Sequence, residues 1–484
     1  MTAALAASLL VVLSAQDTAR RDVLFIAVDD LNDWVGVLGG HPQARTPNID
    51  ALAARGMTFL NAHSPSALCN PSRTALLTGL RPSTSGVYGN NEDWRTMDRF
   101  SGVATLPRHF RDRGYRTFGA GKIFHAHTFG PAGFFGLNDP AAWDAFYPSV
   151  GRQLPDEVGP PLRPSNRNPL FNGFDWSPVV TEDSAMGDGQ VVSWIEQQLV
   201  AETGNPRFVA AGIYRPHLPW YVPQPYFDMH PLESIELPAT IADDLDDVPA
   251  VGRAGSFQST ELHEWVLEDP PRWKEAVQGY LASISFADAM VGRLMQALER
   301  SGRADRTIVV LWGDHGFHLG EKARWRKMTL WEESTHVPLI VVAPGVTTPG
   351  SMSSTPVSLM DIYPTLTALS GLTTPSHVEG ASLVPLLEDP AARRDAPAVT
   401  TYGYRNHAAR SERYRYIQYA DGSEELYDHQ VDPHEWTNLA ADPSFAAVKT
   451  DLARWLPTVN VQPPPPPGRR AGGGGPGGRG QPQP

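Results

Sequence analysis

Short, uninterrupted apolar runs alternate with amphipathic stretches along most of the chain. The first run ends abruptly at two adjacent carboxylates, Asp29 and Asp30. A strand covered by helices on both faces has a continuous apolar sequence, because neither face is exposed to water. Such runs occupy residues 23–28, 208–213, 307–312 and 338–343, and helical patterns at 191–200 and 273–299 precede the second and third. We therefore predict an α/β fold with a large mixed, mostly parallel sheet sandwiched by helices.

The pattern changes after about residue 396. Short strand-like pieces at 414–419 and 425–427 precede a helical stretch at 444–456. This order predicts a small C-terminal antiparallel sheet with one helix. We divide the chain into residues 22–395, a catalytic domain, and residues 396–460, a small α+β subdomain. Residues 461–484 are rich in Pro and Gly and lack large apolar side chains, so we predict a disordered tail.

Residues 1–16 form an apolar run that ends in small residues, which is typical of a signal peptide. No Lys or Arg precedes the run, so a mis-assigned start codon and an unusual signal both stay open. The run is too short to span a bilayer. We expect a periplasmic or secreted protein. A net charge of −13 argues against nucleic-acid binders and anionic-membrane binders, which carry a basic excess.

Cys69 is the only cysteine, so the chain forms no internal disulfide. It opens a short helical pattern that ends at Gly79, and Arg73 follows one turn later. A nucleophile at a helix N-terminus benefits from the positive end of the dipole, and an arginine adds a full charge. From the residues alone, Cys69 fits an anion-binding nucleophile and a buried structural thiol equally well.

Two apolar runs end in groups that bind metals. Asp29 and Asp30 follow the first, and Asp314 and His315 follow the run at 307–312. Strand ends that meet at one sheet edge would form an oxygen-rich site for a hard divalent cation such as Ca²⁺. Taken alone, the Asp pair also fits a helix cap with a solvated neighbour.

Basic residues occur in three further short motifs, each close behind an apolar or metal-binding segment. They contribute Lys122 and His125, then His217, then Lys327. Such groups can hold the oxygens of an anion and supply a proton to a leaving group. A single histidine is more often structural than catalytic. We interpret His318, Glu321 and Lys322 as residues at the rim of this site.

The order Cys69-Asn-Pro-Ser-Arg73, followed by Leu77-Thr-Gly79, resembles the motif of type I sulfatases, which belong to the alkaline-phosphatase-like superfamily. The resemblance extends from Val23 to about Pro457. The joint pattern of Gly-Lys-Ile-Phe-His, Tyr-Arg-Pro-His and Gly-Asp-His-Gly is most similar to iduronate-2-sulfatase-like members.

The resemblance implies that a separate formylglycine-generating enzyme or anaerobic maturase oxidises Cys69 to Cα-formylglycine. It also implies one bound Ca²⁺, with Mg²⁺ as an alternative. His315 departs from the Asn found in many members, which makes it the least certain ligand. The implied catalytic residues are Cys69, Arg73, Lys122, His125, His217 and Lys327. The implied metal ligands are Asp29, Asp30, Cys69, Asp314 and His315.

The roles implied by the resemblance separate into two groups. Lys122 and His125 lie around the formylglycine and the sulfate, and Arg73 stabilises the modified side chain. His217 and Lys327 contact the sulfate and assist the leaving group. Which basic residue is the general acid stays open.

The expected activity is hydrolysis of sulfate monoesters, first of a sulfated carbohydrate. A choline-sulfatase-like enzyme, a phosphonate or phosphate ester hydrolase of the same superfamily, and a non-catalytic sulfoglycan-binding protein are the alternatives. The acidic net charge would repel a polyanion at long range, so we expect short fragments rather than whole polymer.

Overall fold

The computed structural model describes residues 20–126, 136–149, 173–202, 204–254 and 261–463. The predicted signal peptide at 1–16 and the tail from 464 onward lie outside the described residues. So do residues 127–135, 150–172, 203 and 255–260. Among the described helices, none combines the length and the apolar character needed to cross a bilayer.

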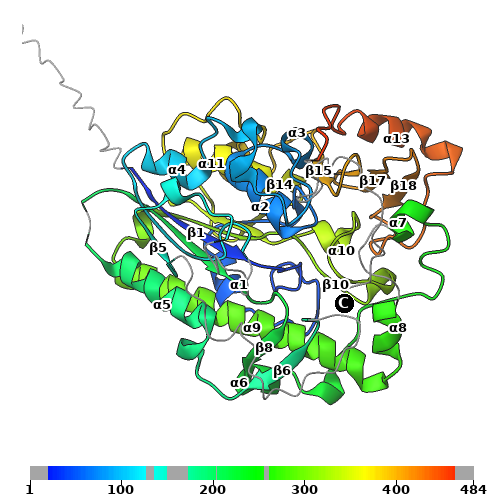
Figure 1. Cartoon of the computed structure of the whole chain (residues 1–484), viewed down its shortest axis with the longest axis horizontal. Helices are drawn as coiled ribbons and strands as arrows, with labels where there is room; N and C mark the ends of the chain where they lie inside the picture. The colour runs from blue at the N-terminus through cyan, green and yellow to red at the C-terminus, as the bar shows by residue number, and fades with distance from the viewer. Residues whose placement is uncertain (1–19, 127–135, 150–172, 203, 255–260, 464–484) are drawn as a thin grey trace, which may run out of the picture.

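An eight-stranded sheet forms the centre of the molecule (Figure 1). β1 lies in the middle and pairs in parallel with β7 on one side and β9 on the other. β12 runs antiparallel to both of its neighbours. The sheet is therefore mixed and mostly parallel, as predicted. Its order is β13 (Ser351–Ser353), β2 (Met57–Phe59), β12 (Leu339–Val342), β9 (Thr307–Gly313), β1 (Asp22–Val28), β7 (Arg207–Ile213), β4 (Arg116–Gly121) and β5 (Ala145–Tyr147).

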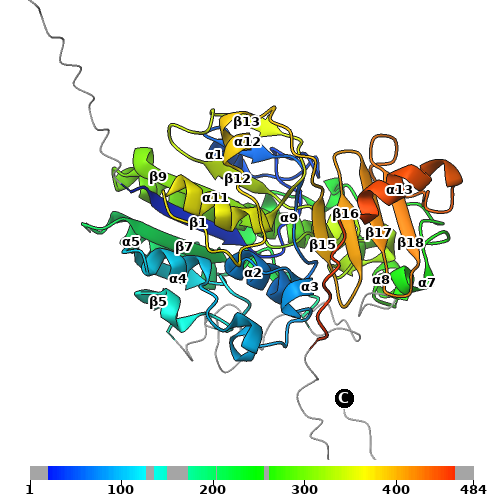
Figure 2. The same ribbon diagram turned by 90° about the horizontal axis from the view of Figure 1, so that it is seen from above.

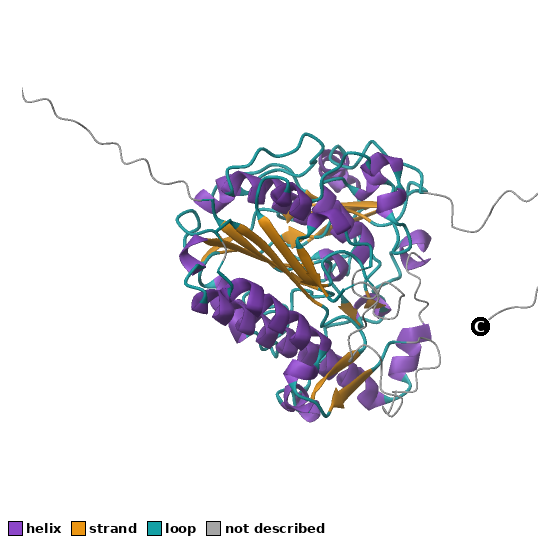
Figure 3. Cartoon of the chain, turned by 60° about the vertical axis from the view of Figure 1, so that its left-hand side comes forward, coloured by secondary structure: helices purple, strands orange, loops and turns teal. Residues whose placement is uncertain are grey.

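Helices cover both faces of the sheet (Figure 3). Leu24, Ile26 and Val28 of β1 point into one core, and the alternate residues of the strand point into the other. Both sets are buried, which explains why the run lacks polar residues. The first core contains α1 (Pro47–Ala53), α5 (Gly187–Val200), α8 (Glu261–Leu267) and α9 (Pro270–Arg300); the second contains α2 (Cys69–Thr78), α4 (Leu106–Arg111), α11 (Ile362–Leu369) and α12 (Val384–Glu388).

A smaller antiparallel sheet lies beside the main body and carries α13 (Ala446–Ala453) on one face (Figure 2). Tyr416, Leu426 and Leu452 form its own small core with the helix. The strands begin two residues after the predicted boundary at 396. They are β15 (Ala398–Thr401), β16 (His407–Arg410), β17 (Tyr414–Gln418) and β18 (Glu424–Asp428).

Buried ion pairs join the small sheet to the main body. Arg415 on β17 lies 2.5 Å from Glu435, and it also pairs with Glu332 at the start of α10 (Glu332–Thr335). Nε2 of His429 donates to the Glu435 carboxylate at 2.8 Å. The carboxylates are enclosed by cations, so the two parts share one charged interface.

Other elements are short. Thr46 stands at the N-cap position of α1, but its hydroxyl oxygen accepts the Gly36 amide instead of capping the helix. Near the site, β6 (Trp176–Val179) pairs with β8 (Trp220–Pro223), and β10 (His318–Leu319) pairs with β11 (Trp325–Arg326). The remaining elements are β3 (Ala62–His63), β14 (Val357–Ser358), α3 (Pro82–Ser85), α6 (Gln224–Asp228) and α7 (Ala250–Ala254).

Candidate active site

The carboxyl ends of β1, β4, β7 and β9 meet at one edge of the sheet, where α/β sheets bind ligands. Asp29 directly follows β1, Lys122 follows β4, and Asp314 follows β9. All three side chains are buried. Because the strands are parallel, residues far apart in the sequence gather here.

Cys69 is the first residue of α2 and is buried. Its Sγ lies 3.1 Å from Nε2 of His315 and 3.9 Å from Nζ of Lys122. Asp30 lies at 3.9 Å on another side. The helix presents its N-terminal end to this point, so Cys69 faces the chemistry from the positive end of α2. An ammonium group, an imidazole and a carboxylate thus surround the Cys69 sulfur.

Arg73 lies one turn along α2 and is completely buried. Nη2 lies 2.9 Å from Asp29, and Nε lies 2.8 Å from Asp314. The same guanidinium donates to the backbone carbonyls of Lys122 and Ile123. Burial opposes its charge, but the two carboxylates outweigh burial and raise the pKa of Arg73. Arg73 therefore fixes α2 to three strand ends at once.

The two adjacent aspartates face different cations. Asp29 pairs with Lys122 as well as Arg73, and these cations outweigh burial to lower its pKa. Asp30 accepts two hydrogen bonds from Nζ of Lys327, at 2.6 and 2.7 Å. Burial dominates there and raises the pKa of Asp30. The pair is therefore not a helix cap, and Asp30 adopts a positive φ of 59° to reach its position.

His315 stands between Cys69 and the carboxylates. Its Nε2 lies 3.4 Å from Asp30 and 3.6 Å from Asp314. Burial lowers its pKa, but Asp314 and the Cys69 sulfur raise it to about 9. A metal at Nε2 requires the neutral ring, so a bound cation and a proton compete for this nitrogen.

The donor set fits a hard divalent cation. Oxygens of Asp29 and Asp314 lie with the Cys69 sulfur inside one group whose atoms are all within 4.8 Å, and Asp30, Cys69 and His315 form a second. Three buried carboxylates repel one another unless cations compensate them, and Ca²⁺ prefers carboxylate oxygens. Every residue predicted to ligate the metal belongs to one of these two groups.

His217 lies beyond β7, at the mouth of the site, with 24% of its side chain exposed. Nδ1 donates to the Leu218 carbonyl at 2.6 Å, and Nε2 lies 3.9 Å from Asp30. Burial, together with Lys122 and Lys327, lowers its pKa well below 6.5. The ring is therefore neutral at pH 7, with Nε2 directed to the cluster.

His125 is buried three residues beyond Lys122 in the same loop. Among the described hydrogen bonds, its backbone carbonyl accepts from Leu137. The structure thus places His125 in the loop that carries Lys122, directly beyond β4.

Two supporting residues escaped the sequence analysis. Asp188, at the start of α5, accepts the amides of Tyr214 at 2.7 Å and Arg215 at 2.9 Å, and so shapes the loop that carries His217. The Tyr280 hydroxyl donates to the Asp30 carbonyl at 2.7 Å. Both lie on helices distant in sequence, and no motif marks them.

The residues expected at the rim are buried instead. Lys322 donates to Asp244 at 2.7 Å and to the Glu435 carbonyl. The His318 ring bonds Thr329, and Glu321 accepts the Leu319 amide. Burial is the largest of the effects that raise the pKa of Glu321 to about 7. The rim interpretation was wrong, because all three side chains are buried and bonded within the protein: Lys322 fastens the loop to the C-terminal part, and His318 and Glu321 bond residues of the loop region itself.

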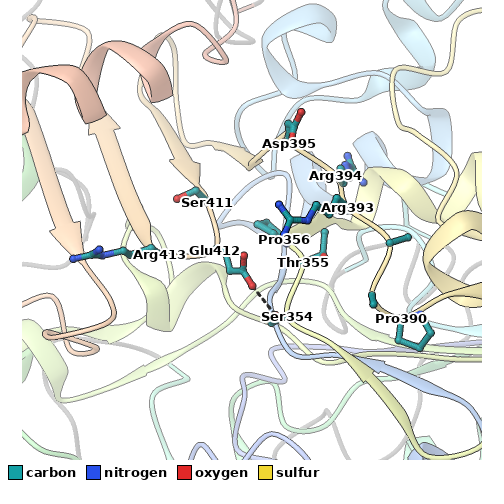
Figure 4. Close-up of a pocket in the computed structure, with 12 residues that line it drawn as sticks. Ser354, Thr355, Pro356, Pro390, Arg393, Arg394, Asp395, Ser411, Glu412 and Arg413 are labelled. Carbon is teal, nitrogen blue, oxygen red and sulfur yellow. Dashed lines mark hydrogen bonds between the residues drawn. The ribbon is translucent and has the colours of Figure 1, made fainter.

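A cavity of about 550 Å³ lies elsewhere, between residues 354–356, 390–395 and 411–413 (Figure 4). Arg394 is paired there with Asp361, and Arg413 with Asp428. Glu412 accepts a hydrogen bond from Ser354 at 2.8 Å. None of the residues predicted for catalysis or metal binding lines this cavity, so it is separate from the candidate site.

Comparison with known proteins gives a consistent result. A family model described as Sulfatase matches residues 21–372, and one described as N-sulphoglucosamine sulphohydrolase, C-terminal, matches residues 320–462. A sulfatase of Formosa agariphila is 40% identical, covering 92% of this chain and 88% of its own. Iduronate 2-sulfatase of Homo sapiens is 31% identical, covering 74% of this chain and 70% of its own.

A solved structure shares the fold. The phosphonate monoester hydrolase of Agrobacterium radiobacter superposes with a TM-score of 0.73 at 24% identity, covering 90% of this chain and 94% of that one. At this level of identity the likeness concerns the fold, and the chemistry has to be argued from the site.

Proposed function

The chain belongs to the sulfatase family and is a sulfuric ester hydrolase, and from this premise we propose that its nucleophile is Cα-formylglycine made from Cys69. Once hydrated, formylglycine supplies two hydroxyls on one carbon, one to attack sulfur and one to expel the sulfate again. The observation that carries the proposal is the position of Cys69 Sγ, which lies among His315, Lys122 and Asp30.

Lys122 and Lys327 provide positive charge for the sulfate. Burial lowers the pKa of each lysine. Asp29 raises the pKa of Lys122 and Asp30 raises that of Lys327, so both pKa values lie above the ordinary value of lysine. Two fixed ammonium groups in a buried site stabilise the charge that develops on sulfate oxygens. Because they already bond carboxylates, they are held in place before substrate enters.

His217 is our candidate for the proton transfer to the leaving alcohol. Its Nδ1 is fixed by the Leu218 carbonyl, so Nε2 has a defined direction. An anionic substrate beside the ring raises the pKa of His217, which favours uptake of a proton that the alcohol then receives. His217 is also the partly exposed member of the cluster, which suits a group that meets the leaving group.

We propose that the metal is Ca²⁺. Asp29, Asp30, Asp314 and His315, with the side chain at position 69, would hold it. Ca²⁺ accepts six to eight ligands in flexible geometry, whereas Mg²⁺ demands a near-ideal octahedron and keeps several waters. A set dominated by carboxylates that also bond Arg and Lys suits the more tolerant ion.

The substrate we propose is a sulfated carbohydrate. Its support is the identity of 31% to iduronate 2-sulfatase over 397 residues. The choline sulfate alternative fits less well, because nothing in the described cluster of Arg, Lys and His selects a quaternary ammonium group. The phosphonate alternative fits less well because the matching family model and the relatives of 30% identity or more are sulfatases. A panel of sulfated mono- and disaccharides with choline sulfate tests this; preference for choline sulfate contradicts it.

We further propose that residues 1–16 direct export to the periplasm or the exterior. A maturation enzyme of the same cell would oxidise Cys69. Because Cys69 is only 1% exposed in the folded chain, the oxidation has to precede the completion of folding.

The experiment is mass spectrometry of the tryptic peptide 56–73 from protein made together with a maturation enzyme, combined with an assay of sulfate release. We expect the aldehyde in that peptide and sulfate release that the Cys69→Ala variant lacks. A fully converted protein that releases no sulfate from any member of the panel contradicts the proposal.

A further inference from the structure

A cluster of arginines lies at the amino ends of the central strands, at the edge of the sheet opposite to Cys69. β1 starts at Asp22 in this cluster and ends just before Asp29 in the active site. Seven residues of strand at about 3.3 Å each separate the two places by about 23 Å. The cluster therefore takes no part in the chemistry described above.

Direct contacts make the cluster continuous. Arg306 donates to the Arg20 carbonyl at 3.1 Å, and Arg20 donates to the Arg113 carbonyl at 2.5 Å. Arg303 lies 2.6 Å from the buried Asp22 carboxylate, and Arg207 lies 3.7 Å from it. Burial is the largest cause that lowers the pKa of Arg207, and the positive charge of the neighbouring Arg303 is the second largest. Two guanidinium groups, those of Arg207 and Arg303, thus share one carboxylate.

The surrounding charges leave the cluster positive. Asp144 compensates Arg116 and the neighbouring Arg111, and Asp112 pairs with Arg108. We name the following residues the amino-edge patch: Arg20, Arg21, Arg113, Arg116, Arg207, Arg303 and Arg306. The patch is unusual in a chain of net charge −13, and Arg20, Arg113, Arg116 and Arg306 are exposed.

We propose that the amino-edge patch binds a second stretch of the sulfated polysaccharide on which the enzyme acts, an inference that rests on the proposed carbohydrate substrate. The planar guanidinium matches two oxygens of a sulfate group, and this fork geometry distinguishes arginine from lysine. The described patch contains arginine and no lysine. The acidic net charge repels a polyanion at long range, so we expect this edge to attract it more than the average surface does.

The acidic net charge alone predicts that the enzyme acts on short fragments rather than on whole polymer, and the amino-edge patch changes this expectation. A polymer repelled by the whole chain still finds one favourable surface, and once held there its free ends are present near the active site at raised effective concentration. Short fragments gain nothing from the patch. The structure thus predicts that polymer binding and turnover of small esters depend on different residues.

The test measures binding of the mature protein to immobilised dextran sulfate, with uncharged dextran as the blank. The Arg20→Ser/Arg113→Ser/Arg306→Ser variant removes three exposed side chains of the patch. The matched control, Arg393→Ser/Arg405→Ser/Arg454→Ser, changes net charge equally at exposed positions outside it. We expect Kd at 0.1 M NaCl to rise about tenfold or more in the patch variant and less than twofold in the control.

Equal losses in the two variants, or none in the patch variant, overturn the proposal. So does equally tight binding of duplex DNA or of anionic phospholipid vesicles, because the patch would then be a general anion surface. The Arg306→Glu variant repeats the test with one exposed residue, and the melting temperature of each variant reports its folding.

The two proposals fail separately. Binding is read without turnover, so a protein that binds through the patch but releases no sulfate contradicts the proposed function. A protein that desulfates short sugars and binds polymer equally well without the patch contradicts this inference.

Discussion

Nε of Arg73 lies 2.8 Å from Oδ2 of Asp314, and neither side chain is exposed. The other arm of the guanidinium reaches Asp29 at 2.9 Å. One residue of α2 therefore determines where the ends of β1 and β9 lie relative to Cys69. The geometry of the site depends on this contact before any substrate is present.

We expect Arg73→Met to abolish detectable turnover and to lower the free energy of unfolding by about 3–5 kcal/mol, because it takes the paired guanidinium from the buried Asp314 and leaves the buried Asp29 with Lys122 alone. Arg55→Met is the control, since Arg55 pairs with Glu299 at the surface; such pairs contribute about 0–1 kcal/mol. Urea unfolding measures both. If Arg73→Met lowers the free energy of unfolding no more than Arg55→Met does, the structural role of Arg73 is contradicted.

Asp188 is a positioning residue, because it acts on His217 through the backbone amides of Tyr214 and Arg215. Asp188→Asn keeps one acceptor oxygen, and we expect kcat to fall about 10- to 100-fold with KM less affected. The exposed Asp228→Asn is the control. If KM rises while kcat stays constant, Asp188 shapes substrate binding and the proposed route through His217 is wrong.

Glu435 connects stability to pH at the interface with the small sheet. Burial opposes its charge, but Arg415 and His429 lower its pKa to about 2. A depressed pKa adds stability above the ordinary value near 4.5, and this stability is lost as pH falls towards 2. We expect Glu435→Gln to lose about 3 kcal/mol at pH 7. The difference from wild type should shrink between pH 4.5 and 2.

Chemical unfolding of both proteins at several pH values checks this. A difference that is constant from pH 7 to 3 would show that Glu435 acts by packing alone.

Substitutions of His315 test whether its side chain is a ligand of the metal. We expect Ca²⁺ affinity to fall about tenfold or more in His315→Ala, and less in His315→Asn, because the amide oxygen is a ligand that Ca²⁺ accepts. Calorimetric titration after chelation measures both. Equal affinity in wild type and both variants would remove His315 from the ligand set, and stronger binding of Mg²⁺ than Ca²⁺ would contradict the proposed ion.

The sequence predicted the fold class because the apolar runs of β1 and β9 are buried on both faces, which leaves a readable pattern. Asp29 and Asp314 were predictable as a group because strand ends converge at one edge, whereas Cys69, at a helix start, was assigned to the site through the resemblance of its motif to that of type I sulfatases. The rim interpretation of Lys322 failed, since a lysine near a site is indistinguishable in sequence from one buried against Glu435.

Other features depend on tertiary contacts that no local pattern encodes. Asp188 and Tyr280 lie on helices whose sequences give no reason to single them out, and their partners belong to other elements. The amino-edge patch joins segments near residues 20, 113, 207 and 306, so its charge is visible only after folding.

The most direct test of the account is the ratio of kcat/KM for 4-nitrophenyl sulfate to that for the phosphate and phosphonate esters of the same alcohol, measured on protein with formylglycine at position 69. The leaving group is constant, so the ratio reports recognition of the group transferred. We predict that the sulfate ester is preferred by about 100-fold or more, equivalent to about 2.7 kcal/mol of transition-state stabilisation. Faster turnover of the phosphate or phosphonate ester would contradict the account.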